Sequence, residues 1–260
     1  MSGSADAADG VSRETLIEGV PPEAAAVAAW MFGTSAATAV RYAQLLTTAG
    51  VERGLLGPRE AARVWSRHLF NCGAIAPALP RGARVADIGS GAGLPGVVLA
   101  IARPDVHMVL IEPMKRRAEF LDEVVELLDL PRVEVRRARA EELAADLAAD
   151  VVTARAVAPL RRLIPLAMRL LRPHGALLAL KGAAAAEELA AAENTLQDHG
   201  AASAVIEHWG GTMLAEPTTV VRVVAGGDPG RRARRSPGSG RQGRRSEAGP
   251  AAPAREEEAP

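Results

Sequence analysis

The sequence predicts an α/β protein, an open and mostly parallel sheet of seven strands that follows a small helical extension. From Arg84 onward, short apolar runs alternate with helical patterns, which is typical of βαβ units. The first apolar run is followed by the glycine-rich segment "DIGSGAGLPG" at 87–96. Folds of this class bind nucleotide-like ligands at that place, after the first strand. Before Arg84 the pattern is helical, which gives the fold its extension.

The helical extension is expected to span 21–80. Its first helix starts at a proline and ends at a glycine, as helices commonly do. In the second helix, Ser35 is the expected N-cap and Gly50 the expected stop. The segment 57–80 predicts a third helix and a short fourth. The extension also holds five aromatic side chains, which are expected in the core rather than as stacking platforms for bases: Trp30, Phe32, Tyr42, Trp65 and Phe70.

The α/β domain is expected to span 81–225. Its strands are predicted at 84–88, 107–112, 133–136, 151–155, 175–180, 203–209 and 218–225. Its helices are predicted at 95–102, 115–129, 141–148, 159–171 and 184–199, with Pro95 at a first helical position. The last two strands are close together in the chain, so they can pair antiparallel.

Both ends of the chain predict disorder. Residues 1–20 are small and polar, and 226–260 are rich in Gly, Pro, Arg and Glu without an apolar face. Seven arginines lie between 231 and 245. A basic tail of this kind can hold RNA loosely, or it can simply keep the protein in solution.

Composition restricts the function classes. Basic and acidic residues balance at 31 each, so nothing global indicates nucleic acid, although a local patch suffices to bind phosphates. The only cysteine, Cys72, excludes an internal disulfide and a cysteine-based metal site, and is expected to be a small core residue. No metal site is expected. No apolar stretch is long enough to span a bilayer, and the N-terminus lacks signal-peptide features, so we expect a cytoplasmic protein. Nothing demands more than a monomer.

The glycine loop allows two ligands. The stretch "GAGLPG" that starts at Gly91 is a formal G-x-G-x-x-G motif and would indicate NAD. However, Asp87 and Gly89 precede it at the strand end, which gives D-x-G-x-G-x-G, the glycine loop of S-adenosylmethionine (SAM) methyltransferases. Glu112 ends the second strand, where a carboxylate can accept both hydroxyls of a ribose. A purely structural glycine-rich turn is the remaining alternative.

Five segments together resemble one family. They are "DIGSGAGLPG", "RHL" at 67–69, "RAEE" at 139–142, "ARAVAPL" at 154–160 and "LALKG" at 178–182. In this combination the chain resembles the RsmG family, also called GidB or glucose-inhibited division protein B, over about residues 20 to 225. The resemblance implies a class I SAM-dependent methyltransferase with a Rossmann-like sheet. It also implies methyl transfer to N7 of one guanine in the 530 loop of 16S ribosomal RNA (rRNA), as free rRNA or within the small ribosomal subunit.

The resemblance assigns cofactor contacts to matching positions. In the loop these are Asp87, Gly89, Gly91, Gly93 and Leu94. Asp87 is expected to fix the loop and to reach the methionine amino group through water, or to serve as a strand-end cap. Glu112 is expected to bind the ribose, and Ala140 with Glu141 to line the adenine. Glu141 also suits the first turn of a helix, where the dipole favours an acid.

Four further residues are expected to position the substrate. Arg139 and Arg155 match arginines of the family, and either a phosphate of RNA or, for Arg155, the SAM carboxylate suits a planar guanidinium. An internal ion pair is the alternative for Arg155. Lys181, one of only two lysines, is either a phosphate or guanine O6 contact or a solvated strand end. His68 is a pocket residue by resemblance, whereas a lone helical histidine is more often structural.

The chemistry of N7 needs no general base, because guanine N7 carries a lone pair and no proton. Catalysis then consists of placing N7 in line with the methyl group and excluding water. The Asn/Asp-Pro-Pro-aromatic turn of exocyclic-amine methyltransferases is absent, since "ARAVAPL" stands in its place. Two other functions stay open, a nucleotide- or RNA-binding protein without catalysis and an NAD-dependent oxidoreductase.

Overall fold

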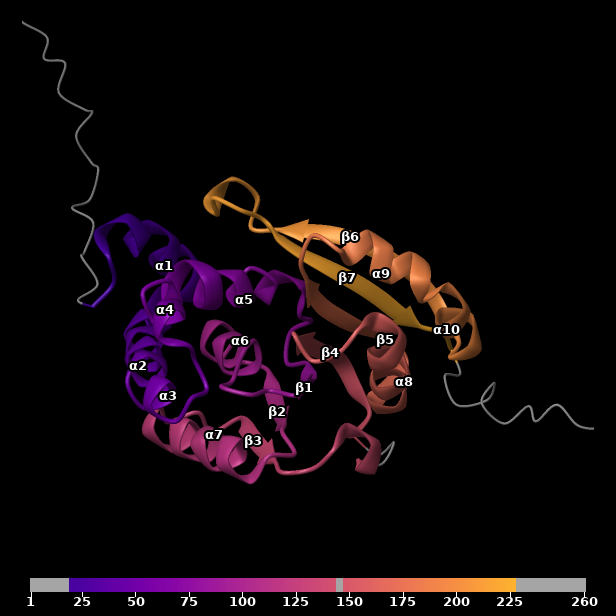
Figure 1. The fold of residues 1–260 in the computed structure, drawn as a ribbon, viewed down its shortest axis with the longest axis horizontal. Helices are drawn as coiled ribbons and strands as arrows, with labels where there is room; N and C mark the ends of the chain where they lie inside the picture. Colours follow the sequence, from indigo (N-terminus) through magenta and orange to yellow (C-terminus); the bar gives the residue numbers. More distant parts are fainter. Residues whose placement is uncertain (1–18, 144–146, 228–260) are drawn as a thin grey trace, which may run out of the picture.

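The computed structural model describes residues 19–143 and 147–227, and these form one α/β fold around a seven-stranded sheet (Figure 1). The strand order is β3-β2-β1-β4-β5-β7-β6. The strands are β1 (Arg84–Ile88), β2 (His107–Ile111), β3 (Val133–Arg136), β4 (Ala149–Arg155), β5 (Leu171–Lys181), β6 (Ala201–Trp209) and β7 (Thr218–Ala225). β1 to β5 pair in parallel, and β7 is antiparallel to both β5 and β6. The predicted sheet is confirmed.

Helices cover both faces of the sheet (Figure 1). On one face lie α6 (Gly96–Ala102) and α7 (Lys115–Leu127), and on the other lie α8 (Leu160–Leu170), α9 (Ala185–Ala191) and α10 (Glu193–Asp198). Successive strand residues point to opposite faces, so Val85 packs in the first core and Ala86 in the second. Burial on both faces explains why the strands read as continuous apolar runs.

The helical extension packs against α6 and completes the first core. Its elements are η1 (Pro22–Ala24), α1 (Ala25–Phe32), η2 (Gly33–Ser35), α2 (Ala36–Thr47), α3 (Ala49–Glu52), α4 (Pro58–Ala61), the π-helix η3 (Val64–Phe70), α5 (Asn71–Gly73) and η4 (Ala76–Ala78). Asn71 donates from its side-chain amide to the Thr218 hydroxyl (2.9 Å), and that hydroxyl donates to the Asn71 carbonyl (2.9 Å). These bonds fix the extension to the start of β7.

Two expectations for the extension are wrong, those for Gly50 and Trp30. Ser35 is the N-cap residue of α2 as expected, although its side chain makes no capping hydrogen bond. Gly50 does not stop a helix, because it is buried inside α3 and its carbonyl accepts the Leu55 and Leu56 amides that follow the turn. Trp30 is 51% exposed on α1, whereas the other four aromatic side chains are buried as expected.

The α/β part also departs from prediction. The helix expected over 141–148 is replaced by a short 3-10 turn, η5 (Ala140–Glu142), and 144–146 lie outside the described residues. β5 starts at Leu171, four residues early, because Leu171 pairs with Ala149 of β4; the register then shifts, and pairing resumes at Ala176. The helix expected over 184–199 is two helices, α9 and α10. Pro95 precedes α6 instead of opening it.

The expected disordered ends lie almost wholly outside the described residues, which begin at 19 and end at 227. The structure therefore leaves the basic tail as a prediction. Within the described ranges, no helix is long and apolar enough to cross a membrane.

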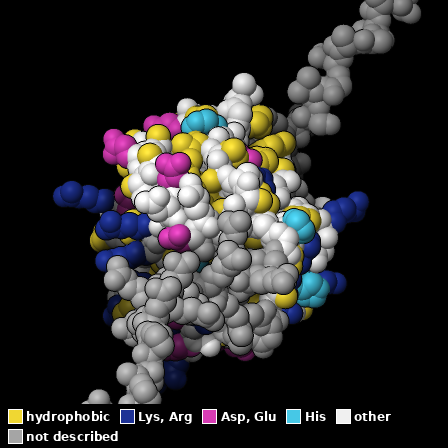
Figure 2. Space-filling model, turned by 90° about the vertical axis from the view of Figure 1, so that its right-hand side faces the viewer, with side chains coloured by type: hydrophobic (Ala, Val, Ile, Leu, Met, Phe, Trp, Pro, Cys, Tyr) yellow, Lys and Arg dark blue, Asp and Glu magenta, His cyan; other side chains and the backbone are white. Residues whose placement is uncertain are grey.

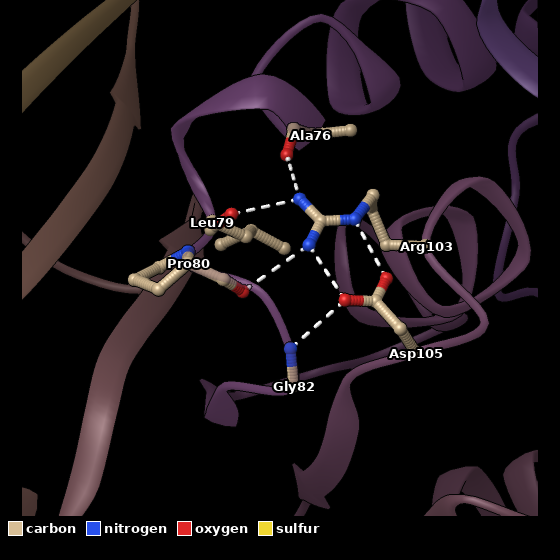
Figure 3. Close-up of polar contacts among 6 residues, drawn as sticks. All are labelled: Ala76, Leu79, Pro80, Gly82, Arg103 and Asp105. Carbon is tan, nitrogen blue, oxygen red and sulfur yellow. Dashed lines mark hydrogen bonds and ion pairs between the residues drawn. The ribbon is translucent and has the colours of Figure 1, made fainter.

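A single arginine, Arg103 at the end of α6, connects the extension to the turn before β2 (Figure 3). The Arg103 guanidinium donates to the carbonyls of Ala76, Leu79 and Pro80 at 2.9, 2.7 and 3.2 Å. It also donates to both carboxylate oxygens of Asp105, at 2.7 and 2.8 Å. Asp105 in turn accepts the Gly82 amide at 2.9 Å. Arg103 thereby satisfies the carbonyls at the end of η4, where the chain enters β1.

Candidate active site

The glycine loop leaves β1 after Ile88 and enters α6 at Gly96. Gly89, Gly91 and Gly93 have φ values of +65°, +58° and +98°, a region that side-chain-bearing residues seldom adopt. The Gly89 amide donates to the Ile111 carbonyl (2.8 Å), so the loop folds back over the end of β2. A Cβ at Gly89 would lie 2.8 Å from the Val157 side chain. The sequence uses glycine here for both reasons, backbone conformation and close approach.

Asp87, near the end of β1, holds the glycine loop in place through hydrogen bonds. Its carboxylate is fully buried, accepting the Thr153 hydroxyl (2.7 Å) at one oxygen and the Gly96 amide (3.2 Å) at the other. The Ser90 hydroxyl donates to the Asp87 carbonyl (3.0 Å). Burial raises the pKa of Asp87 to about 6. These contacts agree with the expected role in fixing the loop.

The raised pKa of Asp87 predicts a specific pH dependence of stability. The unfolded chain loses this proton near its ordinary pKa of 3.8, but the folded protein holds it until about pH 6. The free energy of unfolding therefore falls as pH rises from about 4 to about 6, by at most about 3 kcal/mol, and Asp87 adds no further pH dependence above that.

Urea unfolding at several pH values measures this effect against Asp87→Asn, which cannot ionise. The free-energy difference between the two proteins should change between about pH 4 and 6 and be level above it. Asp122→Asn on the exposed side of α7 is the control. Parallel curves for wild type and Asp87→Asn would contradict the assignment.

Glu112 holds the loop from the β2 side. Only 2% of this residue is exposed. Its carboxylate accepts the Gly91 amide (3.0 Å) and the Met114 amide (3.0 Å), and Arg117 lies 3.9 Å away. Each carboxylate oxygen can accept more than one hydrogen bond. Glu112 can therefore keep the loop in place and still accept ligand hydroxyls.

The extension contributes Tyr42, which sequence reasoning placed only in the core. This side chain is fully buried on α2, and its hydroxyl donates to the Ala92 carbonyl at the tip of the loop (2.7 Å). A Cβ at Gly93 would lie 2.7 Å from the same hydroxyl. A tyrosine among apolar helix positions usually needs a partner for its hydroxyl, and that signal could have indicated this contact.

The end of β3 carries the residues expected at the adenine. Ala140 is buried and Glu141 exposed, both in η5. Arg139 is exposed directly before them, and its amide donates to the Glu142 carboxylate (3.1 Å). This group is separated along the sheet edge from Arg155 and Lys181, because β2 and β1 lie between β3 and β4.

Arg155 contacts the extension rather than a carboxylate. Its guanidinium donates to the Cys72 sulfur (2.9 Å), the His68 Nδ1 (2.8 Å) and the Arg67 carbonyl (3.2 Å). Among the described residues Arg155 forms no ion pair, so the alternative of an internal ion pair is wrong. Its guanidinium is held instead by hydrogen bonds within the protein. Cys72 is buried, as expected, and burial raises the pKa of its thiol.

His68 is a neutral acceptor for Arg155. Burial, and then the charge of Arg155, lower the pKa of His68 to about 4. Because Nδ1 accepts from Arg155, the ring proton is assigned to Nε2, which lies 3.1 Å from the Glu60 carboxylate. His68 thus positions Arg155.

The ammonium group of Lys181 is largely buried and has two hydrogen-bond partners, so the alternative of a solvated strand end is wrong. Its ammonium donates to the Ala158 carbonyl (2.8 Å) and to the Glu188 carboxylate (2.8 Å), and only 10% of its side chain is exposed. Glu188 also accepts the Leu160 amide (2.9 Å). The Lys181–Glu188 pair connects β5 and α9 to the segment 156–160. Val157 of this segment lies against Gly89. Sequence reasoning missed Glu188, because nothing local in an alanine-rich helix distinguishes it from Glu187.

This arrangement predicts that Lys181 acts on the cofactor site through the loop. Lys181→Met and Glu188→Gln should each weaken SAM binding by about tenfold, since one charge-assisted bond contributes about 1.5–3 kcal/mol. The double variant should lose little more than either single one, because the two side chains form one unit. Calorimetric titration measures all three, with exposed Glu187→Gln as the control. A loss of RNA affinity in Lys181→Met alone, with SAM affinity intact, would instead support a phosphate contact.

A cavity of about 1190 Å³ opens beside the loop. Its walls are the extension, the segment after β4, the end of β5 and the connection between β6 and β7. Arg155 and Lys181 both line it, as does Val157. The structure therefore brings these residues together, while Arg139 is not among its lining residues.

The sheet order and the glycine loop define a class I SAM-dependent methyltransferase fold. A solved structure from Methanococcus maripaludis, assigned as an S-adenosyl-L-methionine-dependent methyltransferase, matches with a TM-score of 0.52 and 15% identity, over 68% of this chain and 90% of that chain. The chain belongs to the rRNA small subunit methyltransferase G family, whose model matches residues 35–214.

Two relatives carry the name ribosomal RNA small subunit methyltransferase G. The protein of Streptomyces coelicolor is 53% identical over 201 residues, covering 77% of this chain and 84% of its own length. The protein of a Nocardioides species is 52% identical over 224 residues, covering 86% and 87%. The family resemblance seen in the motifs is confirmed.

Proposed function

We propose that this protein transfers a methyl group from SAM to N7 of a guanine in the 530 loop of 16S rRNA. The observation that carries the proposal is the glycine loop, held by Asp87 and Glu112 and joined through Val157 to a cavity that Arg155 and Lys181 line. The protein would act in the cytoplasm as a monomer, on free rRNA or on the small ribosomal subunit.

The residues present fit SAM. Gly89 to Leu94 offer a bare backbone for the amino-acid end of the cofactor, and Glu112 retains lone pairs for ribose hydroxyls. Ala140 and Glu141 would line the adenine. When bound, SAM supplies a methyl group that is electrophilic because it is attached to a sulfonium. The work of the chain is to orient the two reactants and to exclude water.

No side chain is required as a base. Guanine N7 attacks with its own lone pair and releases no proton. His68 agrees with this scheme, because its Nδ1 is engaged by Arg155 and its side chain is buried. Arg155 and Lys181 would act by position, Arg155 at the cavity wall and Lys181 through the loop.

The geometry also separates SAM from NAD. A dinucleotide would place its pyrophosphate at the N-terminus of α6. There the Gly96 amide already donates to Asp87, whose carboxylate lies below the loop. When ionised, this carboxylate would repel a pyrophosphate, whereas SAM brings no phosphate to that place.

Parallel titration with SAM and NAD, followed by a transfer assay with labelled SAM and 16S rRNA, tests the proposal. We expect binding of SAM, no comparable binding of NAD, and label in the RNA. SAM binding without transfer to any ribosomal RNA would support a non-catalytic binding protein. Preference for NAD would indicate an oxidoreductase and reject the proposal.

A further inference from the structure

One wall of the cavity carries two exposed arginines, Arg63 and Arg67. Neither guanidinium forms a hydrogen bond or ion pair with another residue of the described ranges. The two are four residues apart, with the Arg67 amide donating to the Arg63 carbonyl (2.8 Å) at the start of the π-helix η3. π-helical turns occur frequently at functional sites.

The other charged groups of the cavity leave these arginines as its available cations. Lys181 and Glu188 satisfy each other, and Arg155 is held by the extension. The remaining carboxylates of the described lining, Glu23 in η1 and Glu216 in the connection between β6 and β7, are exposed and lie in other elements than η3. The π-helix wall is therefore locally cationic.

On the face shown in Figure 2, the described side chains form no separate basic patch that could bind RNA in place of the cavity. Among the described side chains visible on that face, basic and acidic ones are interspersed (Figure 2). The whole chain is also neutral, with 31 residues of each sign. A local group of cations such as that in the cavity is sufficient to bind the phosphates of a polyanion.

The position and size of the cavity indicate its ligand. Val157 lies against Gly89 and also lines the cavity, so the cavity adjoins the place where a methyl group would be presented. Its volume of about 1190 Å³ exceeds the roughly 300–1,000 Å³ that pockets for single small molecules occupy. There is room for an unstacked nucleotide together with part of its neighbours.

We infer that this cavity binds an unpaired RNA nucleotide, and that Arg63 and Arg67 bind the phosphates that flank it. A guanidinium fork matches the geometry of a phosphate and needs no base contact. The inference rests on the proposed function, since it names the phosphate contacts of the same substrate. It assigns binding to two residues whose guanidinium groups form no hydrogen bond or ion pair with the glycine loop or with the Lys181–Glu188 pair.

The test is the salt dependence of RNA affinity in Arg63→Gln/Arg67→Gln. Fluorescence anisotropy with a labelled 530-loop RNA hairpin gives the dissociation constant at several KCl concentrations. Each lost phosphate contact should reduce the slope of log affinity against log salt by about 0.7 for a single strand, so by about 1.4 for both. Affinity near 0.1 M salt should fall tenfold or more. Arg169→Gln, exposed on α8 and outside the cavity, should leave slope and affinity unchanged.

The outcomes separate the inference from the proposed function. Calorimetric SAM affinity should be unchanged in the double variant, which shows that it is folded and that only RNA binding is altered. A wild-type salt slope in the double variant would overturn the inference while the proposed function stands. Failure of the wild-type protein to bind the hairpin, naked 16S rRNA and small subunits alike would overturn both.

Discussion

Replacing Glu112 by Gln is expected to weaken SAM binding by about 100-fold or more. The carboxylate accepts the Gly91 and Met114 amides with its two oxygens, at 3.0 Å each, and is nearly fully buried. An amide of the same shape can accept only one of these bonds, and its NH₂ group then faces a second donor. Hydrogen bonds to charged groups contribute about 1.5–3 kcal/mol, and 1.4 kcal/mol is a tenfold change in affinity.

Calorimetric titration with SAM measures this loss. Glu126→Gln on the exposed side of α7 is the matched control, since it removes one carboxylate away from the loop. Far-ultraviolet circular dichroism shows whether the Glu112 variant remains folded. A folded variant that binds SAM with wild-type affinity would remove Glu112 from the cofactor site.

Replacing Arg103 by Met is expected to produce the largest loss of stability, about 2–4 kcal/mol in the free energy of unfolding. The guanidinium serves the carbonyls of Ala76, Leu79 and Pro80 and pairs with Asp105 (Figure 3). Arg103 holds the pKa of the Asp105 carboxyl well below its usual range. Without the guanidinium, carbonyls in a partly buried turn lose their donors, and each unsatisfied group costs about 1–3 kcal/mol when buried.

Urea unfolding gives the value, and Arg81→Met provides the control. Arg81 is exposed in the same turn, so its loss removes a charge with no comparable contacts. Because Arg103 holds the extension in place, the extension and the sheet of the Arg103→Met variant should also unfold with less cooperativity than in the wild type. Equal free energies of unfolding for the two variants would show that the hydrogen bonds drawn in Figure 3 make no measurable contribution to stability.

Sequence patterns predicted the central strand β1 well because it is parallel to its neighbours, is buried on both faces and reads as an apolar run. β1, β3 and β7 lie where predicted. The start of β5 was missed because Arg172 and Pro173 are polar or turn-forming, and only the pairing of Leu171 with Ala149 of β4 brings this segment into the strand. The π-helix η3 was also missed, since local periodicity does not distinguish it from an α-helix.

The loop side of the site was predictable for a related reason. Glycine spacing and strand-end acids are local signals, and they indicated Asp87, Gly89 and Glu112, which the structure brings together at the loop. Tyr42, Glu188 and the contacts of Arg155 depend on residues distant in the chain, which no local pattern brings together. Lys181 was recognised as unusual, but its partner could be found only from the fold.

The most direct test of the account is to identify the methylated nucleoside. Purified protein and labelled SAM are given small ribosomal subunits from a strain that lacks the modification, with naked 16S rRNA in parallel. The RNA is then digested, and the labelled nucleoside is identified and mapped. The account predicts N7-methylguanosine in the 530 loop, in at least one of the two substrates. Label on another atom or at another site, or SAM binding without transfer to either substrate, would contradict it.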